Sequence, residues 1–238
     1  MVVTIVTLVS AIRLVIFDIA GTIIADRGEV VRAFSSALKK HGIPYTDAEL
    51  AEWKGASKRE VIRRFVGEEG RAGEDRAEKI YADFRNILEQ EYRSGGIDPI
   101  PGAARTFDWL RERGIQIAVT TGFYREVTEL ILDRTGWRDR FVANITSSDV
   151  RMGRPAPYMI FRAMEAADVV SVRDVINVGD TPLDLQAGTN AGVREVVGVL
   201  TGLHNKERLQ REPHTALLPS VADLPDWTLQ RALVGQDG

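Results

Sequence analysis

Three apolar runs in this sequence each end in side chains that could bind a metal ion or a phosphate group. The runs are residues 14–17, 115–119 and 175–178. The polar residues that follow them are Asp18, then Thr121 and Gly122, then Asp180 and Asp184. A short run rich in β-branched residues is typical of a buried parallel strand. Because open α/β sheets bind ligands at the carboxyl ends of their strands, we expect these side chains to gather at one edge of a sheet.

Three carboxylates at one sheet edge indicate a cation site. Asp18, Asp180 and Asp184 cannot all stay ionised at short range unless a cation lies among them. Oxygen ligands suit Mg²⁺, which also contacts substrate phosphate oxygens. Two alternatives compete with this interpretation. Asp18 could hydrogen-bond the backbone that follows it, and Asp184 could cap the start of a helix, a role that we expect it to combine with the first.

The elements that must position these residues alternate between strands and helices, except in one block. From Ala25 to Gly96 the apolar residues follow helical spacing, with a capping box at Thr46–Glu49, and no strand is predicted. Further strands are expected at residues 141–145, 193–200 and 216–218, and the last residues are expected to fray. The predicted fold is a Rossmann-like, doubly wound α/β core with a parallel sheet, residues 1–24 and 97–238, and an inserted all-helical cap domain, residues 25–96.

The ordered motifs resemble those of the haloacid dehalogenase superfamily of phosphotransferases. They comprise an acid, a hydroxyl followed by glycine, a cation at Arg154 and an acid pair, and together they span nearly the whole chain. The resemblance implies that Asp18 is the nucleophile that forms an aspartyl-phosphate. It also implies that Asp18, Asp180 and the backbone carbonyl of Ala20 hold Mg²⁺ directly, with Asp184 acting mainly behind them.

Three further residues are expected to bind the transferring phosphoryl group. Thr121 and the Gly122 amide supply hydrogen-bond donors, and Arg154 adds a delocalised charge with a fixed fork of donors. Most relatives carry Lys where this chain has Arg154. A loop arginine next to a proline is usually a solvated surface charge, but its place between the second and fourth motifs favours the functional interpretation.

Ala20 departs from the pattern of the superfamily's phosphatases. In those enzymes a second Asp occupies this position, protonates the leaving oxygen and then activates water. A methyl group can do neither. Either this chain is impaired as a phosphatase, or another group activates its leaving group.

The segment Trp53–Glu60 in the predicted cap offers such a group. Together with Ala20 and Arg154, Lys58 shortly after Gly55 resembles the phosphonoacetaldehyde hydrolase (phosphonatase) branch of the superfamily, whose cap lysine forms a Schiff base with the substrate aldehyde. A protonated imine is an electron sink, so carbon can leave phosphorus as an enamine. Without the resemblance, a helix-surface lysine would be interpreted as a solvated charge.

Two cap positions differ from that branch. Lys54 stands where a Met precedes the glycine, and Val61 stands where a His follows the lysine. If residues 54–58 are helical, the charge of Lys54 lies one turn from Lys58 and would lower its pKa.

Composition excludes several other classes of protein. The 238 residues carry a net charge of −3 without a basic run, which argues against nucleic-acid binding. The sequence has no Cys, which is compatible with a reducing cytoplasm. Residues 1–17 fall short of the roughly 20 apolar residues that span a bilayer, so we interpret residues 1–11 as an extension and expect no membrane anchor. The resemblance makes a homodimer plausible.

These observations predict a Mg²⁺-dependent hydrolase that cleaves the C–P bond of a 2-oxoethyl-type phosphonate through Asp18 and Lys58. One alternative is a phosphomonoesterase of the phosphoglycolate phosphatase kind. The other is a catalytically weakened binding or regulatory protein.

Overall fold

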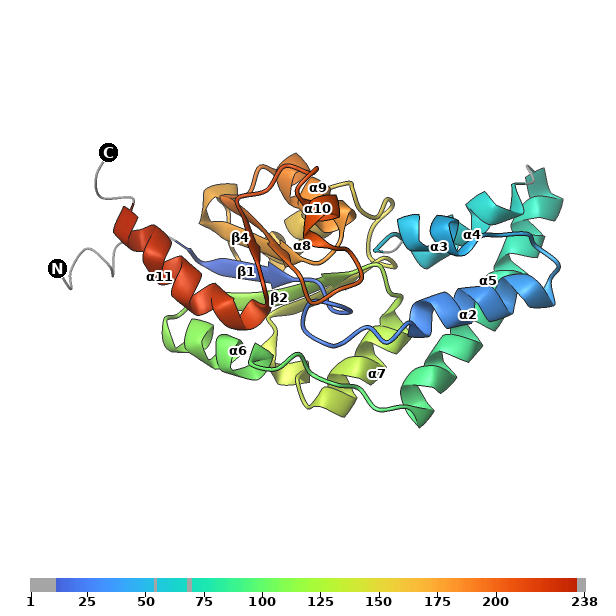
Figure 1. Ribbon diagram of the computed structural model, residues 1–238, viewed down its shortest axis with the longest axis horizontal. Coiled ribbons are helices and arrows are strands. Elements are labelled where there is room, and N and C mark those ends of the chain that lie inside the picture. Colours follow the sequence, from blue (N-terminus) through green and yellow to red (C-terminus); the bar gives the residue numbers. More distant parts are fainter. Residues whose placement is uncertain (1–11, 54, 68–69, 235–238) are drawn as a thin grey trace.

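A six-stranded parallel sheet forms the centre of the protein (Figure 1). The computed structural model describes residues 12–53, 55–67 and 70–234. The strands are β1 Leu14–Phe17, β2 Gln116–Thr121, β3 Ala143–Thr146, β4 Val175–Gly179, β5 Glu195–Val199 and β6 Ala216–Leu218. They lie in the order β3-β2-β1-β4-β5-β6. Each predicted strand is present, and β3 and β6 occupy the two edges of the sheet.

The register of the sheet brings the ends of the three functional strands together. β1 lies between β2 and β4, and Phe17 pairs with both Val119 and Val178. Because all three strands run parallel, the residues that follow these positions emerge at one edge of the sheet. Asp18 therefore lies between the end of β2 and the end of β4.

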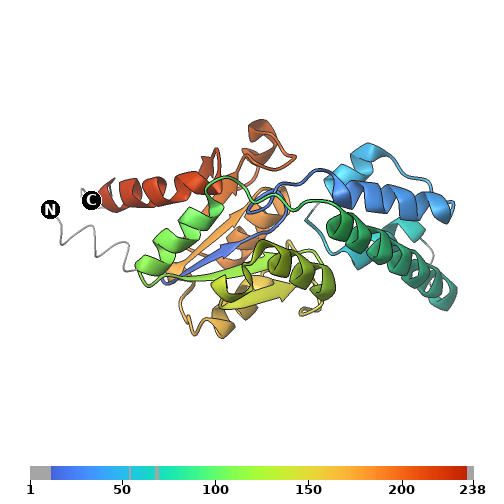
Figure 2. The same cartoon turned by 90° about the horizontal axis from the view of Figure 1, so that it is seen from below.

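Helices cover both faces of the sheet (Figure 2). The core helices are α6 Ala103–Glu112, α7 Arg125–Thr135, α8 Tyr158–Ala166, α9 Pro182–Ala191, α10 Lys206–Leu209 and α11 Leu224–Val234. Val15 and Phe17 of β1 pack in one hydrophobic cluster with residues of α6 and α7. Leu14 and Ile16 pack in a second cluster with residues of α8 and α9. This alternation is what a strand buried on both faces requires.

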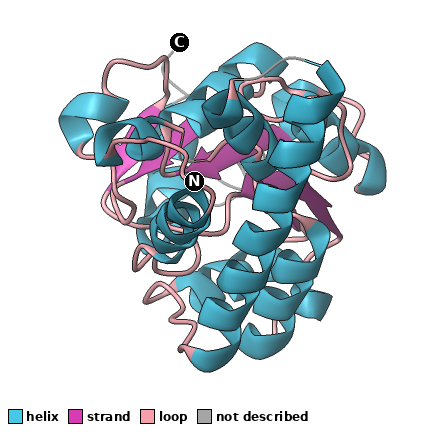
Figure 3. Ribbon diagram, turned by 90° about the vertical axis from the view of Figure 1, so that its right-hand side faces the viewer, coloured by secondary structure: helices cyan, strands magenta, loops and turns pink. Residues whose placement is uncertain are grey.

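The cap consists of helices α2 Glu29–Lys40, α3 Asp47–Glu52, α4 Lys58–Val66 and α5 Gly70–Ser94. Figure 3 shows these helices in front of the sheet. Helices α2 and α5 pack together through Phe34 and Phe84, whose ring centroids lie 4.4 Å apart. Thr46 and Glu49 form the predicted capping box before α3. Between positions 25 and 96 the described residues contain no strand, so the prediction of an inserted all-helical cap is confirmed.

Two neighbouring segments connect the cap to the core (Figure 2). Ile24 and Pro99 form an antiparallel bridge. The Ala25 amide donates to the Asp98 carbonyl at 2.8 Å, and the Ile100 amide donates to the Ile23 carbonyl at 2.9 Å. The outgoing and returning segments therefore act as one paired linker.

The C-terminal region is more ordered than the sequence predicts. Helix α11 was not predicted from the sequence. Val221 and Leu224 before and at its start are fully buried, and Thr106 of α6 donates to the Val221 carbonyl at 3.0 Å. Packing against α6 stabilises a segment that lacks a strong periodic pattern of its own. The expectation for residues 1–11 lies outside the described residues, and none of the described helices is long and apolar enough to cross a membrane.

Candidate active site

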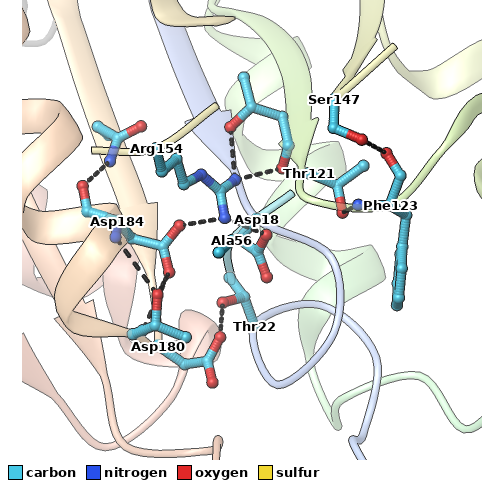
Figure 4. A network of polar contacts seen from close by, with 12 residues as sticks. Asp18, Thr22, Ala56, Thr121, Phe123, Ser147, Arg154, Asp180 and Asp184 are labelled. Carbon is cyan, nitrogen blue, oxygen red and sulfur yellow. Dashed lines mark hydrogen bonds and ion pairs between the residues drawn. The ribbon is translucent and has the colours of Figure 1, made fainter. Parts of the chain in front are cut away.

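Asp18 occupies the centre of a buried polar network at the carboxyl edge of the sheet (Figure 4). The residue is 6% exposed, and its Oδ1 accepts a hydrogen bond from Arg154 Nη1 at 2.7 Å. Burial raises the pKa of Asp18 to about 6, and the charge of Asp184 adds to this effect while Arg154 opposes it. Asp18 is therefore a carboxylate whose ionisation depends on nearby positive charge.

Arg154 is not the surface charge that its loop position would allow, since it is only 5% exposed. Its Nη1 also forms an ion pair with Asp184 Oδ1, and its Nη2 donates to the Thr120 carbonyl at 2.6 Å and to Thr120 Oγ1 at 2.9 Å. These contacts occupy four of the five N–H directions of a guanidinium and leave Nε–H for a further acceptor. In this arrangement Arg154 mainly holds Asp18.

Three buried carboxylates form the group that could hold a metal ion. Oxygen atoms of Asp18, Asp180 and Asp184 all lie within 4.8 Å of one another. Asp180 accepts a hydrogen bond from Thr22 Oγ1 at 3.1 Å. Asp184 Oδ2 accepts hydrogen bonds from the Thr181 amide at 3.0 Å and its hydroxyl at 2.6 Å, which completes the helix cap expected from the sequence. Oxygen donors with net negative charge fit a hard divalent cation such as Mg²⁺.

Glycines allow the backbone to enclose Asp180. A Cβ on Gly21 would lie 2.4 Å from Asp180 Oδ2, and one on Gly202 would lie 1.8 Å from the same atom. Gly21 also has φ of +92°, a conformation that other residues rarely adopt. Any larger residue here would displace the carboxylate.

The cap reaches the core next to the predicted phosphate-binding residues. Thr121 Oγ1 accepts a hydrogen bond from the Phe123 amide at 3.1 Å, which leaves its O–H as a donor. A Cβ on Gly122 would lie 2.5 Å from the Gly55 carbonyl oxygen and 2.6 Å from that of Ala56. Only glycine at position 122 lets the cap loop approach this closely.

Lys58 of the cap lies in the same cavity as Asp18. It is 4% exposed, its Nζ donates to the Ala56 carbonyl at 3.0 Å, and that nitrogen lies 5.5 Å from the centroid of the Phe123 ring. The alternative of a solvated surface lysine is therefore wrong. The residues that line the cavity are Asp18, Ala20, Asp26, Val30, Gly55, Lys58, Thr121, Gly122, Phe123 and Thr181.

The cavity is small in this conformation. Its volume is about 20 Å³, room for about one water molecule. This volume does not accommodate a substrate with a phosphorus group.

The helical geometry assumed in the hypothesis about Lys54 is not met at residues 55–57, and an effect of Lys54 on the pKa of Lys58 stays a prediction. Lys54 lies outside the described residues, and helix α4 begins only at Lys58. Gly55 has φ of +86°, so no continuous helix joins positions 54 and 58. Val61 is buried in the hydrophobic cluster that the cap shares with one face of the sheet, and it supplies no titratable group.

Sequence reasoning missed several residues that border this site, among them Thr22, Asp26, Thr120 and Phe123. Thr120 and Thr22 hold Arg154 and Asp180, and Asp26 and Phe123 line the cavity. Thr22 and Thr120 adjoin recognised motifs, so their hydroxyl groups were a usable signal. Asp26 follows the end of β1 by nine positions and nothing in the local pattern separates it from a loop acid. The roles proposed for the residues of the site stay predictions.

Comparison with known proteins identifies the family. A family model described as haloacid dehalogenase-like hydrolase matches residues 15–199. The chain belongs to the haloacid dehalogenase-like hydrolase family. A phosphonoacetaldehyde hydrolase from Hahella chejuensis is 35% identical over 222 residues, covering 87% of this chain and 74% of that protein. Another from Parabacteroides distasonis is 33% identical, covering 79% of this chain and 76% of that protein.

Solved structures of haloacid dehalogenase-like hydrolases have the same fold. A phosphonoacetaldehyde hydrolase-like protein from Oleispira antarctica has a TM-score of 0.81 at 24% identity, covering 96% of each chain. A predicted phosphoglycolate phosphatase from Haemophilus somnus has a TM-score of 0.77 at 20% identity, covering 92% of this chain and 98% of that chain. The protein is thus a hydrolase of this family and is similar in sequence to phosphonoacetaldehyde hydrolases.

Proposed function

We propose that the protein is a Mg²⁺-dependent phosphonatase that cleaves the C–P bond of phosphonoacetaldehyde or a closely related 2-oxoethyl phosphonate. The observation that carries this proposal is the buried Lys58, which borders one cavity together with Asp18 and Ala20. A carboxyl group at position 20 would serve a leaving alcohol. The methyl group of Ala20 and the nearby amine of Lys58 favour a leaving carbon that is activated as an imine.

Asp18, Asp180 and Asp184 would hold the metal, since their oxygens lie together and carry more negative than positive charge. Bound Mg²⁺ would neutralise charge on the phosphonate oxygens and on the attacking carboxylate. Arg154 keeps one oxygen of Asp18 in a fixed position, so that the second can face phosphorus.

Lys58 performs the activating step. Its free amine adds to the aldehyde carbon, and uptake of one proton with loss of water gives a protonated imine. Burial around Phe123 and Val30 excludes bulk water, which would otherwise hydrolyse the imine early. The positive C=N group then accepts the electron pair of the C–P bond.

Asp18 attacks phosphorus as that bond breaks. The P–O bond to Asp18 forms, and the carbon departs as an enamine on Lys58 that takes up one proton to become an imine again. Water hydrolyses the imine to acetaldehyde and the aspartyl-phosphate to inorganic phosphate. The net reaction consumes one water. Thr121 and the Gly122 amide are the donors best placed beside Asp18 to bind the equatorial oxygens.

The cap of residues 25–96 would open and close on the core of residues 1–24 and 97–238 during each cycle. The small volume of the closed cavity supports this proposal, because substrate must enter before Lys58 is buried.

Borohydride trapping tests the proposed function. With phosphonoacetaldehyde and Mg²⁺, borohydride is expected to inactivate the enzyme and to leave a stable secondary amine on Lys58, located by peptide mass mapping. Lys58→Ala should abolish both turnover and trapping. Lys79→Ala, which removes an exposed lysine of α5, is the matched control and should retain both. Turnover of phosphoglycolate or another phosphate ester without trapping would instead establish a phosphomonoesterase, and no turnover of either class would indicate a binding protein.

A further inference from the structure

The chemistry proposed for Lys58 needs a group that moves protons, and none has been assigned. An ammonium must lose a proton before its nitrogen can attack an aldehyde, and the hydroxyl of the resulting carbinolamine must be protonated before it leaves as water. Position 61, where the phosphonatase branch has a His, holds the buried Val61. Another residue must therefore carry this proton.

Of the residues that line the cavity, one can serve as the proton-transfer group for Lys58. Among the described residues that line it, the titratable groups are Asp18, Asp26 and Lys58. Asp18 is held by Arg154 and is the nucleophile. Lys58 is the group that needs a base. Asp26 is the carboxyl group that has no other task in the reaction.

Asp26 has a defined position on the paired linker. The preceding residue, Ala25, donates to the Asp98 carbonyl at 2.8 Å, which ties this segment to the returning chain. Asp26 Oδ1 accepts a hydrogen bond from the Gly28 amide at 2.7 Å. The residue is half-buried, so its carboxyl group has access to solvent for proton exchange.

Phe123 forms one wall of the cavity that Asp26 and Lys58 line. Its ring meets the buried Tyr92 ring edge-on, with centroids 5.9 Å apart, and its centroid lies 5.5 Å from Lys58 Nζ. Asp26, Asp18, Lys58 and Phe123 all line this cavity, so the Asp26 carboxyl group and the Lys58 amine border the same enclosed space.

We infer that Asp26 is the general acid–base residue for the imine chemistry of Lys58, an inference that rests on the proposed function. Asp26 takes one proton from the Lys58 ammonium, and the freed electron pair forms the C–N bond to the aldehyde carbon while the C=O pair moves to oxygen. A second proton passes from that nitrogen to the oxygen and gives the neutral carbinolamine. Asp26 then gives that proton to the carbinolamine oxygen, which leaves as water while the C=N bond forms. The same steps run in reverse when the imine is hydrolysed to acetaldehyde.

Asp26 and Lys58 both belong to the cap, Asp26 beside the paired linker and Lys58 at the start of α4. They line one cavity together with Asp18 of the core. The proton-transfer group and the amine therefore meet the substrate aldehyde in the same enclosed space.

The test measures how fast Lys58 forms its imine. Enzyme, Mg²⁺ and phosphonoacetaldehyde are mixed, and borohydride is added at increasing times to trap the imine. Asp26→Asn, whose amide oxygen can still accept from the Gly28 amide, is expected to slow trapping by about 100-fold, the lower range for loss of a general acid–base group. Asp26→Ser is the second variant, and Asp26→Glu should recover part of the rate.

Two controls separate proton transfer from structural damage. Glu29→Gln changes a neighbouring buried acid that does not line the cavity, and its trapping rate should stay within threefold of the wild-type rate. Added formate, a small carboxylate, should accelerate trapping in Asp26→Ser but not in the wild-type enzyme.

The outcomes distinguish this inference from the proposed function. If wild-type enzyme traps no imine on Lys58, the proposed function is wrong and the role of Asp26 falls with it. If wild-type enzyme traps normally and both Asp26→Asn and Asp26→Ser trap at the same rate, only the role of Asp26 is overturned. Equal slowing in Glu29→Gln, without rescue by formate, would also overturn it.

Discussion

Replacing Gly122 with Ala should uncouple the cap from the active site without removing any group that performs chemistry. The added Cβ would lie 2.5 Å from the Gly55 carbonyl oxygen and 2.6 Å from that of Ala56. Ordinary contact begins near 3.4 Å, so both backbone oxygens must retreat by almost 1 Å. The alanine keeps the amide N–H at position 122, so the proposed phosphate contact survives.

The displacement of the Gly55 and Ala56 carbonyl groups should also move Lys58. Lys58 Nζ donates a hydrogen bond to the Ala56 carbonyl at 3.0 Å, and Lys58 follows Ala56 by two residues. A shift of about 1 Å at a reacting group costs on the order of 100-fold in rate. We therefore expect Gly122→Ala to lower kcat/KM for phosphonoacetaldehyde and the rate of borohydride trapping by about 100-fold each, while Mg²⁺ affinity is unchanged because the carboxylates are untouched.

Gly153→Ala is the matched control for this prediction. Gly153 also faces the cap, but a Cβ there would have Ser57 Cβ as its nearest neighbour, at an ordinary 3.5 Å. Its activity should stay within threefold of the wild-type value. If Gly122→Ala traps imine as fast as Gly153→Ala, the cap loop does not position Lys58 and the reasoning fails.

Three further predictions concern the core. Thr120→Val removes one acceptor from Arg154 Nη2. Loss of a hydrogen bond to a charged group, ~1.5 kcal/mol, should slow turnover about tenfold, and the effect should be much smaller in an Arg154→Lys background. Equal effects in both backgrounds would contradict the fork arrangement of Arg154. The pKa of Asp18 is raised to about 6, so protons compete with metal for this carboxylate below that pH. The Kd for Mg²⁺ measured by calorimetry should therefore rise about tenfold per pH unit below 6 and stay constant above it. A constant Kd down to pH 5 would refute this prediction. Ala20→Asp should increase hydrolysis of phosphate esters, measured as phosphate release, because the new carboxyl group can act as a general acid for a leaving oxygen. Unchanged ester turnover would show that position 20 does not select the leaving group.

The sequence was sufficient to predict those parts of the site that follow strand ends. Asp18, Thr121 and Asp180 each end or follow a buried apolar run, and parallel pairing leaves such residues no other edge to occupy. The helical periodicity of residues 25–96 likewise predicted the cap. Helix α11 was missed because its stability comes from packing of Val221 and Leu224 on α6, a tertiary contact that local patterns do not report.

The residues that were missed share a different cause: their partners are far away along the chain. Thr120 matters because Arg154, 34 positions later, needs acceptors for its second nitrogen. Asp26 matters because it lines the same cavity as Lys58. No spacing rule connects such pairs, since the loops between them can change length without moving either end.

The position of Ala20 explains why the cap must supply what the core lacks. In the proposed mechanism the core supplies the nucleophile, the metal-binding carboxylates and the phosphate donors at one sheet edge, and the sheet register holds the residues concerned in place. The leaving group lies on the opposite side of phosphorus from Asp18, because attack and departure are in line. That side faces the cap, where Lys58 is buried. A carbon leaving group in the proposed reaction therefore needs its electron sink on the cap, which is where Lys58 lies.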